Sequence, residues 1–248
     1  MYVLSTEIKN SEKISDFSKP FKYAKGLLKY QEAVEVQREL AEKVIVEDLA
    51  DSIQIVGGMD VSCNLYDPHQ MIYASTVALS YENLQVVETS SVAEKQTFPY
   101  IPGLLSFRES PSLIRSFEKL QKKPDVLLID GQGICHPRGL GIASHIGVLL
   151  DIPTIGVAKS ILVGEQSGEL GKEVGSQLSL IWKGKTVAMS LRTKRGSNPL
   201  IISIGHRISL QTAVEVVKRC LKGYRLPEAT RQAHIAANQH RRSRTWTP

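Results

Sequence analysis

The sequence DVLLIDGQGICHPRGLGIASHIGVLLDIPTIGVAKS, a stretch over residues 125–160, has the clearest secondary-structure pattern in the chain. It begins with a short apolar run, Val126–Ile129, which is typical of a buried strand, and Asp130 follows this run directly. A glycine-rich loop leads to an apolar helix over Ile142–Leu150 and to a second strand over Thr154–Ala158. A strand, a helix and a strand in this order predict two parallel strands joined by a helical crossover.

The residues before this stretch predict an antiparallel meander in the same sheet. Three runs of strand-forming residues are separated by turn residues: Ile53–Ser62, Met71–Tyr81 and Leu84–Val92. Apolar residues at helical spacing predict two helices, an amphipathic one over Gly26–Leu49 and one over Gly103–Gln121. These elements add strands and covering helices to the parallel unit.

The residues after the stretch extend the sheet and cover it. We expect a hairpin over Leu178–Leu191 that turns at Lys183–Lys185, a strand over Leu200–Ile204, and helices over Ser209–Lys222 and Pro227–His240. No repeat or linker divides the chain. The sequence therefore predicts an α/β fold, a mixed central β-sheet flanked by helices, as a single domain over residues 23–240. Residues 1–22 are expected to form a flexible arm, and residues 241–248 a basic tail.

Composition excludes several classes of protein. The chain has 248 residues, of which 42% are hydrophobic, so it can bury a core without disulfides. Its longest uncharged apolar stretch, Gly139–Leu150, is well short of the roughly 20 residues of a membrane span. The polar N-terminus resembles neither a signal nor a transit peptide. Three widely spaced cysteines favour small buried hydrophobic residues in a reducing compartment over a metal site, so we expect a soluble, cytoplasmic protein without a membrane partner.

The positive charge of the chain lies at one end. The formal net charge is +6, and residues 218–248 carry +7 while the preceding 217 residues carry −1. A localised cationic segment suits a polyphosphate partner, because each neutralised phosphate releases counterions. A solvated helix with a frayed tail explains the same charge equally well.

Three acidic residues stand in unusual positions. Asp60 lies inside an apolar strand, Asp130 ends another strand before Gly131, and Glu109 lies near a helix start. Each has a structural explanation by itself: a turn hydrogen bond for either Asp, and the helix dipole for the Glu. Together they could form a cluster of oxygen ligands at one sheet edge, where carboxylates need a cation among them. Such a cluster suits Mg²⁺, or Mn²⁺ as a substitute, and phosphodiester hydrolysis.

Four sequence blocks carry a family resemblance. They are the 125–160 stretch without its first residues (DGQGICHPRGLGIASHIGVLLDIPTIGVAKS), FPYIPGLLSFRESP, MDVS and LPEATRQAH. Together they closely resemble endonuclease V, a family with a ribonuclease-H-like fold that repairs deaminated bases. The similarity runs from about Ala33 to His234. Residues 1–22 and 241–248 lie outside it.

The resemblance implies a role for particular residues. Asp60, Glu109 and Asp130 fall on the metal-binding positions of the family, and three others on active-site positions: His136, Lys159 and His234. Tyr100, at the tip of the Pro-Tyr-Ile-Pro loop, falls on the wedge that enters the duplex beside the lesion. The positions that line the pocket for the extruded base are Gly103, Leu105, Gly131 and Ile142. Without the resemblance, the two histidines read as loop and surface residues, the lysine as a solvated side chain, and the tyrosine as a packing residue.

The implied reaction is metal-dependent hydrolysis of the second phosphodiester bond 3′ to a deoxyinosine, leaving a 3′-hydroxyl and a 5′-phosphate. Three alternatives stay open: cleavage of inosine-containing RNA, a non-catalytic relative that only binds nucleic acid, and a resolvase-like nuclease that reads junction shape. The intact carboxylates argue against the second, and the wedge and pocket against the third. We expect a monomer whose partner is nucleic acid.

Overall fold

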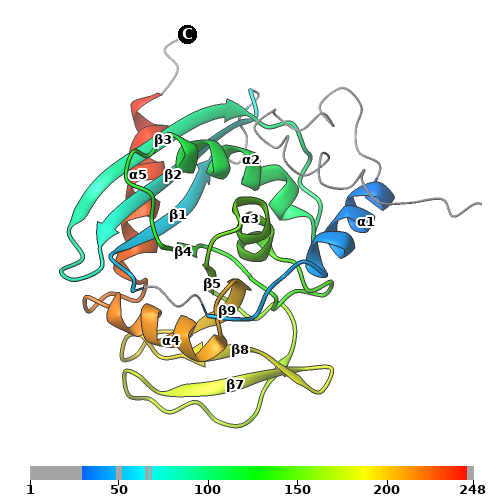
Figure 1. Cartoon of the computed structure of the whole chain (residues 1–248), viewed down its shortest axis with the longest axis vertical. Helices are drawn as coiled ribbons and strands as arrows, with labels where there is room; N and C mark the ends of the chain where they lie inside the picture. Colours follow the sequence, from blue (N-terminus) through cyan, green and yellow to red (C-terminus); the bar gives the residue numbers. More distant parts are fainter. Residues whose placement is uncertain (1–29, 49–51, 65–66, 68, 245–248) are drawn as a thin grey trace, which may run out of the picture.

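The computed structural model describes residues 30–48, 52–64, 67 and 69–244. A single mixed sheet of nine strands runs through this part of the chain, in the order β3-β2-β1-β4-β5-β9-β8-β7-β6 (Figure 1). The predicted arm, residues 1–22, lies outside the described residues, as do residues 245–248 of the predicted tail. Among the described residues, no helix combines the length and the apolar character needed to cross a lipid bilayer.

The centre of the sheet is the predicted parallel unit. Strand β1 (Ile55–Cys63) pairs in parallel with β4 (Val126–Ile129), and β4 pairs in parallel with β5 (Thr154–Ala158). Helix α3 (Ile142–Leu150) makes the crossover between β4 and β5. The bounds of these last three elements are those that the sequence predicts. The carboxyl ends of β1, β4 and β5 therefore meet at one edge of the sheet.

Antiparallel strands extend the sheet on both sides. Strands β2 (Met71–Ser80) and β3 (Val86–Lys95) form the predicted meander with β1. On the other side β9 (Leu200–His206) pairs with β5, and β8 (Lys185–Leu191) and β7 (Gln177–Trp182) form the predicted hairpin. The sequence did not predict β6 (Glu165–Gln166), a two-residue edge strand in a polar segment. Such a strand is formed by pairing with β7 alone, so no residue pattern reveals it.

Alternating residues of the central strands pack against helices on the two faces of the sheet. Val126 and Leu128 pack against residues of α4 (Leu210–Arg219) and α5 (Glu228–Ser243). Leu127 and Ile129 pack against residues of α2 (Leu105–Glu118) and α3. This period of two places a fully buried core on each face.

Helix α5 lies very close to β1, and this closeness requires a glycine. A Cβ atom at Gly58 would lie only 2.0 Å from the carbonyl oxygen of Ala229. Helix α5 therefore brings its side chains to the end of β1. It continues to Ser243, three residues beyond the predicted end at His240, so Arg241 and Arg242 belong to a helix and not to a loose tail.

The first helix ends earlier than its sequence pattern predicts. Helix α1 covers Tyr30–Ala41, whereas residues 44–48 are not helical. The N–H of Ile45 donates to His206 Nδ1 at 3.2 Å, and its carbonyl accepts from the N–H of Arg207 at 2.8 Å. The backbone hydrogen bonds of this segment are thus made with the end of β9. Val44, Ile45 and Val46 are β-branched, which also disfavours a longer helix.

Candidate active site

Three carboxylates come together at the carboxyl edge of the parallel strands. Asp60 lies in β1 and Asp130 follows β4; the N–H of Asp130 donates to the carbonyl of Met59 at 3.1 Å, so the two acidic residues are neighbours across the strand pair. Glu109 comes from α2, which packs on the same face of the sheet as α3. The sequence alone left it open whether these three side chains converge, and the structure brings them within electrostatic reach of one another.

Burial and mutual repulsion disfavour the charged forms of two of these groups. The pKa of Glu109 is raised to about 8, chiefly by burial and then by the negative charges of Asp60 and Asp130, although Arg108 opposes the shift. The pKa of Asp60 is raised to about 6, again first by burial and then by Asp130. A divalent cation among these oxygens would relieve both effects.

The chemistry of the donor set fits such a cation, but the side chains are turned toward other partners. Among the described residues, no three His, Cys, Asp or Glu side chains are gathered closely enough to hold a metal ion as they stand. Asp130 forms an ion pair with Lys159, and Asp60 accepts from the N–H of Val61 at 2.7 Å. The three carboxylates, all oxygen donors without a thiolate, match the preference of Mg²⁺ and Mn²⁺.

Lys159 follows β5 at the same edge of the sheet. Its ammonium group contacts the carboxylate of Asp130 while 43% of its side chain remains exposed to solvent. Its carbonyl oxygen accepts from a guanidinium nitrogen of Arg225 at 3.0 Å. The lysine is thus fixed at both its backbone and its side chain, unlike an ordinary solvated residue.

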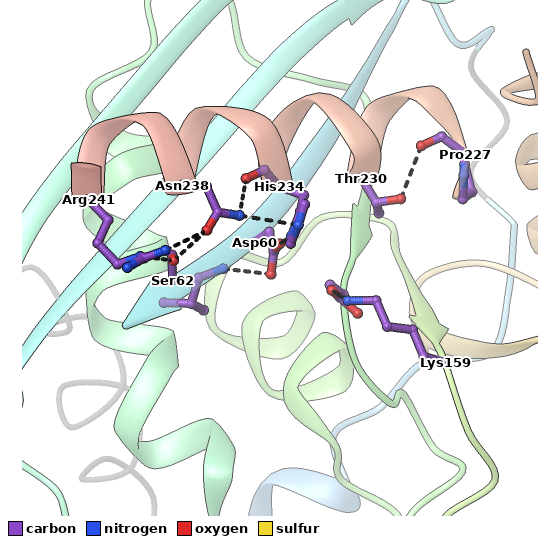
Figure 2. A network of polar contacts seen from close by, with 10 residues as sticks. Asp60, Ser62, Lys159, Pro227, Thr230, His234, Asn238 and Arg241 are labelled. Carbon is purple, nitrogen blue, oxygen red and sulfur yellow. Dashed lines mark hydrogen bonds and ion pairs between the residues drawn. The ribbon is translucent and has the colours of Figure 1, made fainter. Parts of the chain in front are cut away.

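His234 on α5 contacts Asp60 directly (Figure 2). Its Nδ1 atom lies 2.7 Å from Oδ2 of Asp60, and its Nε2 atom lies 3.2 Å from the side-chain nitrogen of Asn238. Arg241, outside the region of family resemblance, continues this network: its Nε donates to Ser62 Oγ at 2.8 Å and a terminal nitrogen to Asn238 Oδ1 at 3.3 Å. Sequence reasoning missed Asn238 and Arg241 as site residues, because their only signal is a spacing of one and two helical turns beyond His234.

His136 is buried beside a pocket. Burial, followed by the positive charge of Arg138, lowers its pKa to about 4, and a hydrogen bond with the backbone of Gly103 opposes this shift. Its Nδ1 accepts from the N–H of Arg138 at 3.2 Å. The imidazole is therefore neutral near pH 7, which favours a role in orienting a polar group over a role as a cation.

The pocket has a volume of about 400 Å³ and contains all four residues expected to line a base site. These are Gly103, Leu105, Gly131 and Ile142, and Tyr100, Asp130, His136 and Lys159 line it as well. Gly131 has a φ of +151°, and a Cβ atom there would lie 2.4 Å from a side-chain carbon of Ile142. Any other residue at position 131 would therefore clash with Ile142 in the wall of the pocket. The pocket is thus lined by three of the six expected active-site residues, Asp130, His136 and Lys159.

Leu162 and Gln37 are among the pocket residues that sequence reasoning missed. Leu162 follows β5, and Gln37 lies on α1 with only 1% of its surface exposed. Gln37 shares the buried face of the helix with Ala33 and Leu40. A polar residue on an apolar helix face was the available signal, since a buried amide requires hydrogen-bond partners.

Tyr100 does not pack against its own domain. Its side chain lies in the loop before α2 and is 65% exposed, with the guanidinium carbon of Arg108 5.9 Å from its ring centroid. The alternative of a packing residue is therefore not supported by its surroundings. An exposed ring at the mouth of the pocket can contact a bound molecule.

Comparison with known proteins decides the family. The model of the endonuclease V family matches residues 38–235. The chain belongs to the endonuclease V family. Endonuclease V of Protochlamydia amoebophila is 55% identical over 212 residues, which cover 86% of this chain and 90% of the relative. That of Gloeobacter violaceus is 48% identical over 214 residues, covering 86% and 87%. The chain is accordingly a nuclease, and the predicted resemblance is confirmed.

Solved endonuclease V structures confirm the predicted fold. The Streptomyces avermitilis protein is 35% identical and superposes with a TM-score of 0.82 over 88% of this chain and 95% of its own. The catalytic domain of human endonuclease V is 37% identical, with a TM-score of 0.79 over 85% and 95%. A Ciona intestinalis endonuclease V variant was solved with a 23-mer DNA containing an inosine followed by a ribo-adenosine. It is 30% identical, with a TM-score of 0.76 over 86% and 97%.

Proposed function

We propose that this endonuclease V hydrolyses the second phosphodiester bond 3′ to a deoxyinosine in DNA and leaves a 3′-hydroxyl and a 5′-phosphate. The observation that carries the proposal is the trio of Asp60, Glu109 and Asp130 beside a pocket with a glycine wall. The pocket is large enough for one extruded base, and Asp130 of the trio lines it. Binding of inosine-containing DNA by the Ciona relative supports the substrate class.

Asp60, Glu109 and Asp130 would hold Mg²⁺, which Mn²⁺ can replace. When bound, the ion would supply a polarised water and neutralise charge on the phosphate. His234 would keep the Asp60 carboxylate in place through its 2.7 Å hydrogen bond. Lys159, which contacts Asp130, would contact a phosphate oxygen once the carboxylate turns to the ion.

The remaining residues would bind and orient the substrate. Gly103, Leu105, Gly131 and Ile142 would enclose the extruded base, whose unstacking costs a few kcal/mol and least for a mispaired base. The neutral imidazole of His136, hydrogen-bonded to the backbone of Gly103, would orient a water or a phosphate oxygen beside the pocket. Tyr100 would fill the gap left in the duplex.

Cleavage of inosine-containing RNA is the second candidate. The nucleic acid in the Ciona complexes contains a ribonucleotide directly after the inosine, which favours a tolerance of ribose at that position in the relative. The protein is further proposed to act as a monomer in the cytoplasm, because one chain supplies every residue of the site and its three cysteines are free. Light scattering of the purified protein tests the monomer.

One set of oligonucleotides tests both substrates. Matched strands would contain inosine in DNA, inosine in DNA with one ribonucleotide after it, inosine in RNA, or adenosine in each context. Incubation with Mg²⁺, Mn²⁺ or EDTA, followed by mapping of the cut, is expected to give metal-dependent cleavage at the second bond 3′ to inosine in DNA. The variant Asp130→Ala serves as the control for a contaminating nuclease. Cleavage confined to strands with a ribonucleotide would replace the DNA proposal by the RNA one.

A further inference from the structure

We propose that Gln37, Arg138 and Gln132 set the base specificity of the pocket, so that it accepts a base edge with a single ring N–H and rejects one with an exocyclic amino group. The inference rests on the proposed function of the pocket as a base-binding site. Its basis is the pattern of occupied and unoccupied hydrogen-bond acceptors in the pocket wall.

Gln37 joins two separate segments of the wall. Its side-chain nitrogen donates to the carbonyl of Gly103 at 3.0 Å and to the carbonyl of Leu140 at 2.8 Å. Both of these residues line the pocket, and they are 66 and 103 residues away from Gln37 in the sequence. Both N–H groups of the amide are therefore used on wall carbonyls.

Arg138 completes the occupation of the Gly103 carbonyl. A terminal guanidinium nitrogen donates to this oxygen at 2.7 Å, and Nε donates to the side-chain oxygen of Gln37. A carbonyl oxygen has two lone pairs, and Gln37 and Arg138 take one each. The oxygen has no lone pair left for a ligand.

Three further wall carbonyls each accept from one donor within the protein. The carbonyl of Gln132 accepts from the N–H of Ala143 at 3.0 Å, and that of Ser160 from the side-chain nitrogen of Gln132 at 2.9 Å. The carbonyl of Lys159 accepts from Arg225. An amino group brought into this pocket would lose its water and would compete with donors already bound to the Gly103 carbonyl and to these three.

Gln132 supplies the exception. Because its amide nitrogen is anchored on Ser160, its amide orientation is fixed, and its Oε1 atom is buried without a hydrogen-bond partner among the described residues. An acceptor of this kind suits one N–H group. Hypoxanthine offers a single N–H on its pairing edge, at N1, whereas adenine has no hydrogen at N1 and carries an amino group at C6. Guanine has the N1–H but also carries an amino group at C2.

The test measures discrimination rather than activity. Binding of the full-length protein to oligonucleotides that differ only in one central base, inosine, guanosine or adenosine, is measured by fluorescence anisotropy in EDTA. We expect Gln37→Met and Arg138→Met to reduce the preference for inosine over guanosine by about tenfold, because each substitution frees an acceptor for the amino group. Arg138→Lys can still donate to Gly103 and should retain most of the preference. Gln132→Met should instead weaken inosine binding while guanosine binding changes by a similar factor.

Controls separate specificity from folding and from the proposed function. Glu39→Gln, exposed on the same helix as Gln37, should leave every affinity and the melting temperature unchanged. A purely structural role for Gln37 and Arg138 would lower the affinity for all three bases alike, and an unchanged ratio would overturn the inference. If the wild-type protein itself shows no preference for inosine in DNA or RNA, the proposed function fails instead.

Discussion

The Nδ1 atom of His234 on helix α5 donates to Oδ2 of Asp60 on strand β1 at 2.7 Å, across 174 residues of sequence. A series of side-chain hydrogen bonds that begins at Arg241 determines which of these two atoms is the donor. Arg241 can only donate, and it donates to Ser62, whose hydroxyl donates in turn to Asn238 Oδ1 at 3.0 Å. The amide nitrogen of Asn238 then faces Nε2 of His234, so a neutral imidazole carries its proton at Nδ1.

Loss of the Asn238 amide should therefore loosen Asp60. We expect Asn238→Ala to weaken the affinity for Mg²⁺ by about 10- to 100-fold, the usual effect of removing a residue that orients a ligand. Titration of the protein with Mg²⁺, followed by calorimetry, measures this affinity. Nitrogen NMR of His234 should show a proton at Nδ1 in the wild type and a mixture of tautomers in the variant. Gln239→Ala, exposed on the same helix, is the matched control and should change neither property.

The raised pKa of Glu109 predicts that the stability of the metal-free protein depends on pH. Bound Mg²⁺ should remove this dependence. Because the pKa in the folded state, about 8, lies above the unfolded value, the folded protein binds the proton more tightly, and stability is lost as the pH rises from about 4.5 to about 8. In EDTA, the melting temperature of the wild type should fall over this range relative to Glu109→Gln, by on the order of 5 °C.

Mg²⁺ provides the second arm of that experiment. It should restore the melting temperature of the wild type at pH 8 and have little effect on Glu109→Gln, which should also lose cleavage. Parallel melting curves of the two proteins with and without EDTA make the comparison. Identical pH dependence in both would show that Glu109 does not titrate as proposed.

His145 should make the protein sensitive to acid. Its ring is 1% exposed, lies 2.9 Å from Ser106 Oγ, and has a pKa lowered to about 4 by burial. The unfolded chain binds the proton more readily, so stability is complete above about pH 6.5 and is lost as the pH falls toward 4. Between pH 6.5 and 5 the loss should reach about 2 kcal/mol. Urea unfolding of the wild type and of His145→Gln measures the difference, which should be absent in the variant.

The exposure of Tyr100 predicts a role in binding without a role in stability. Tyr100→Ala should keep the wild-type melting temperature and lose about tenfold or more in affinity for inosine-containing duplex, since one stacked base contributes roughly 1–3 kcal/mol. Single strands should lose less, because their stack is already open, and Tyr100→Phe should retain the wild-type affinity. An equal loss on duplex and single strand, with a lower melting temperature, would contradict a wedge.

The central unit of the fold follows from local sequence patterns. The bounds of β4, α3 and β5 agree with the pattern, because each is a largely apolar run without Asp, Glu, Lys or Arg that stops before Asp130, Asp151 or Lys159. The sequence also allowed Asp60 and Asp130 to share one edge of the sheet, because both lie on strands, although it left open whether their side chains converge. Both inferences depend only on residues close together in the chain or on strand direction.

The rest of the site was decided by tertiary structure. The early end of α1 follows from hydrogen bonds of Ile45 with the end of β9, and the pocket wall follows from Gln37 reaching Gly103 and Leu140. Arg241 lies outside the region of family resemblance, yet the close approach of α5 to Gly58 brings it to Ser62 beside Asp60. Local periodicity specifies which face of an element is buried, whereas the partner of a buried polar group depends on where the packed chain places a segment that lies far away in the sequence.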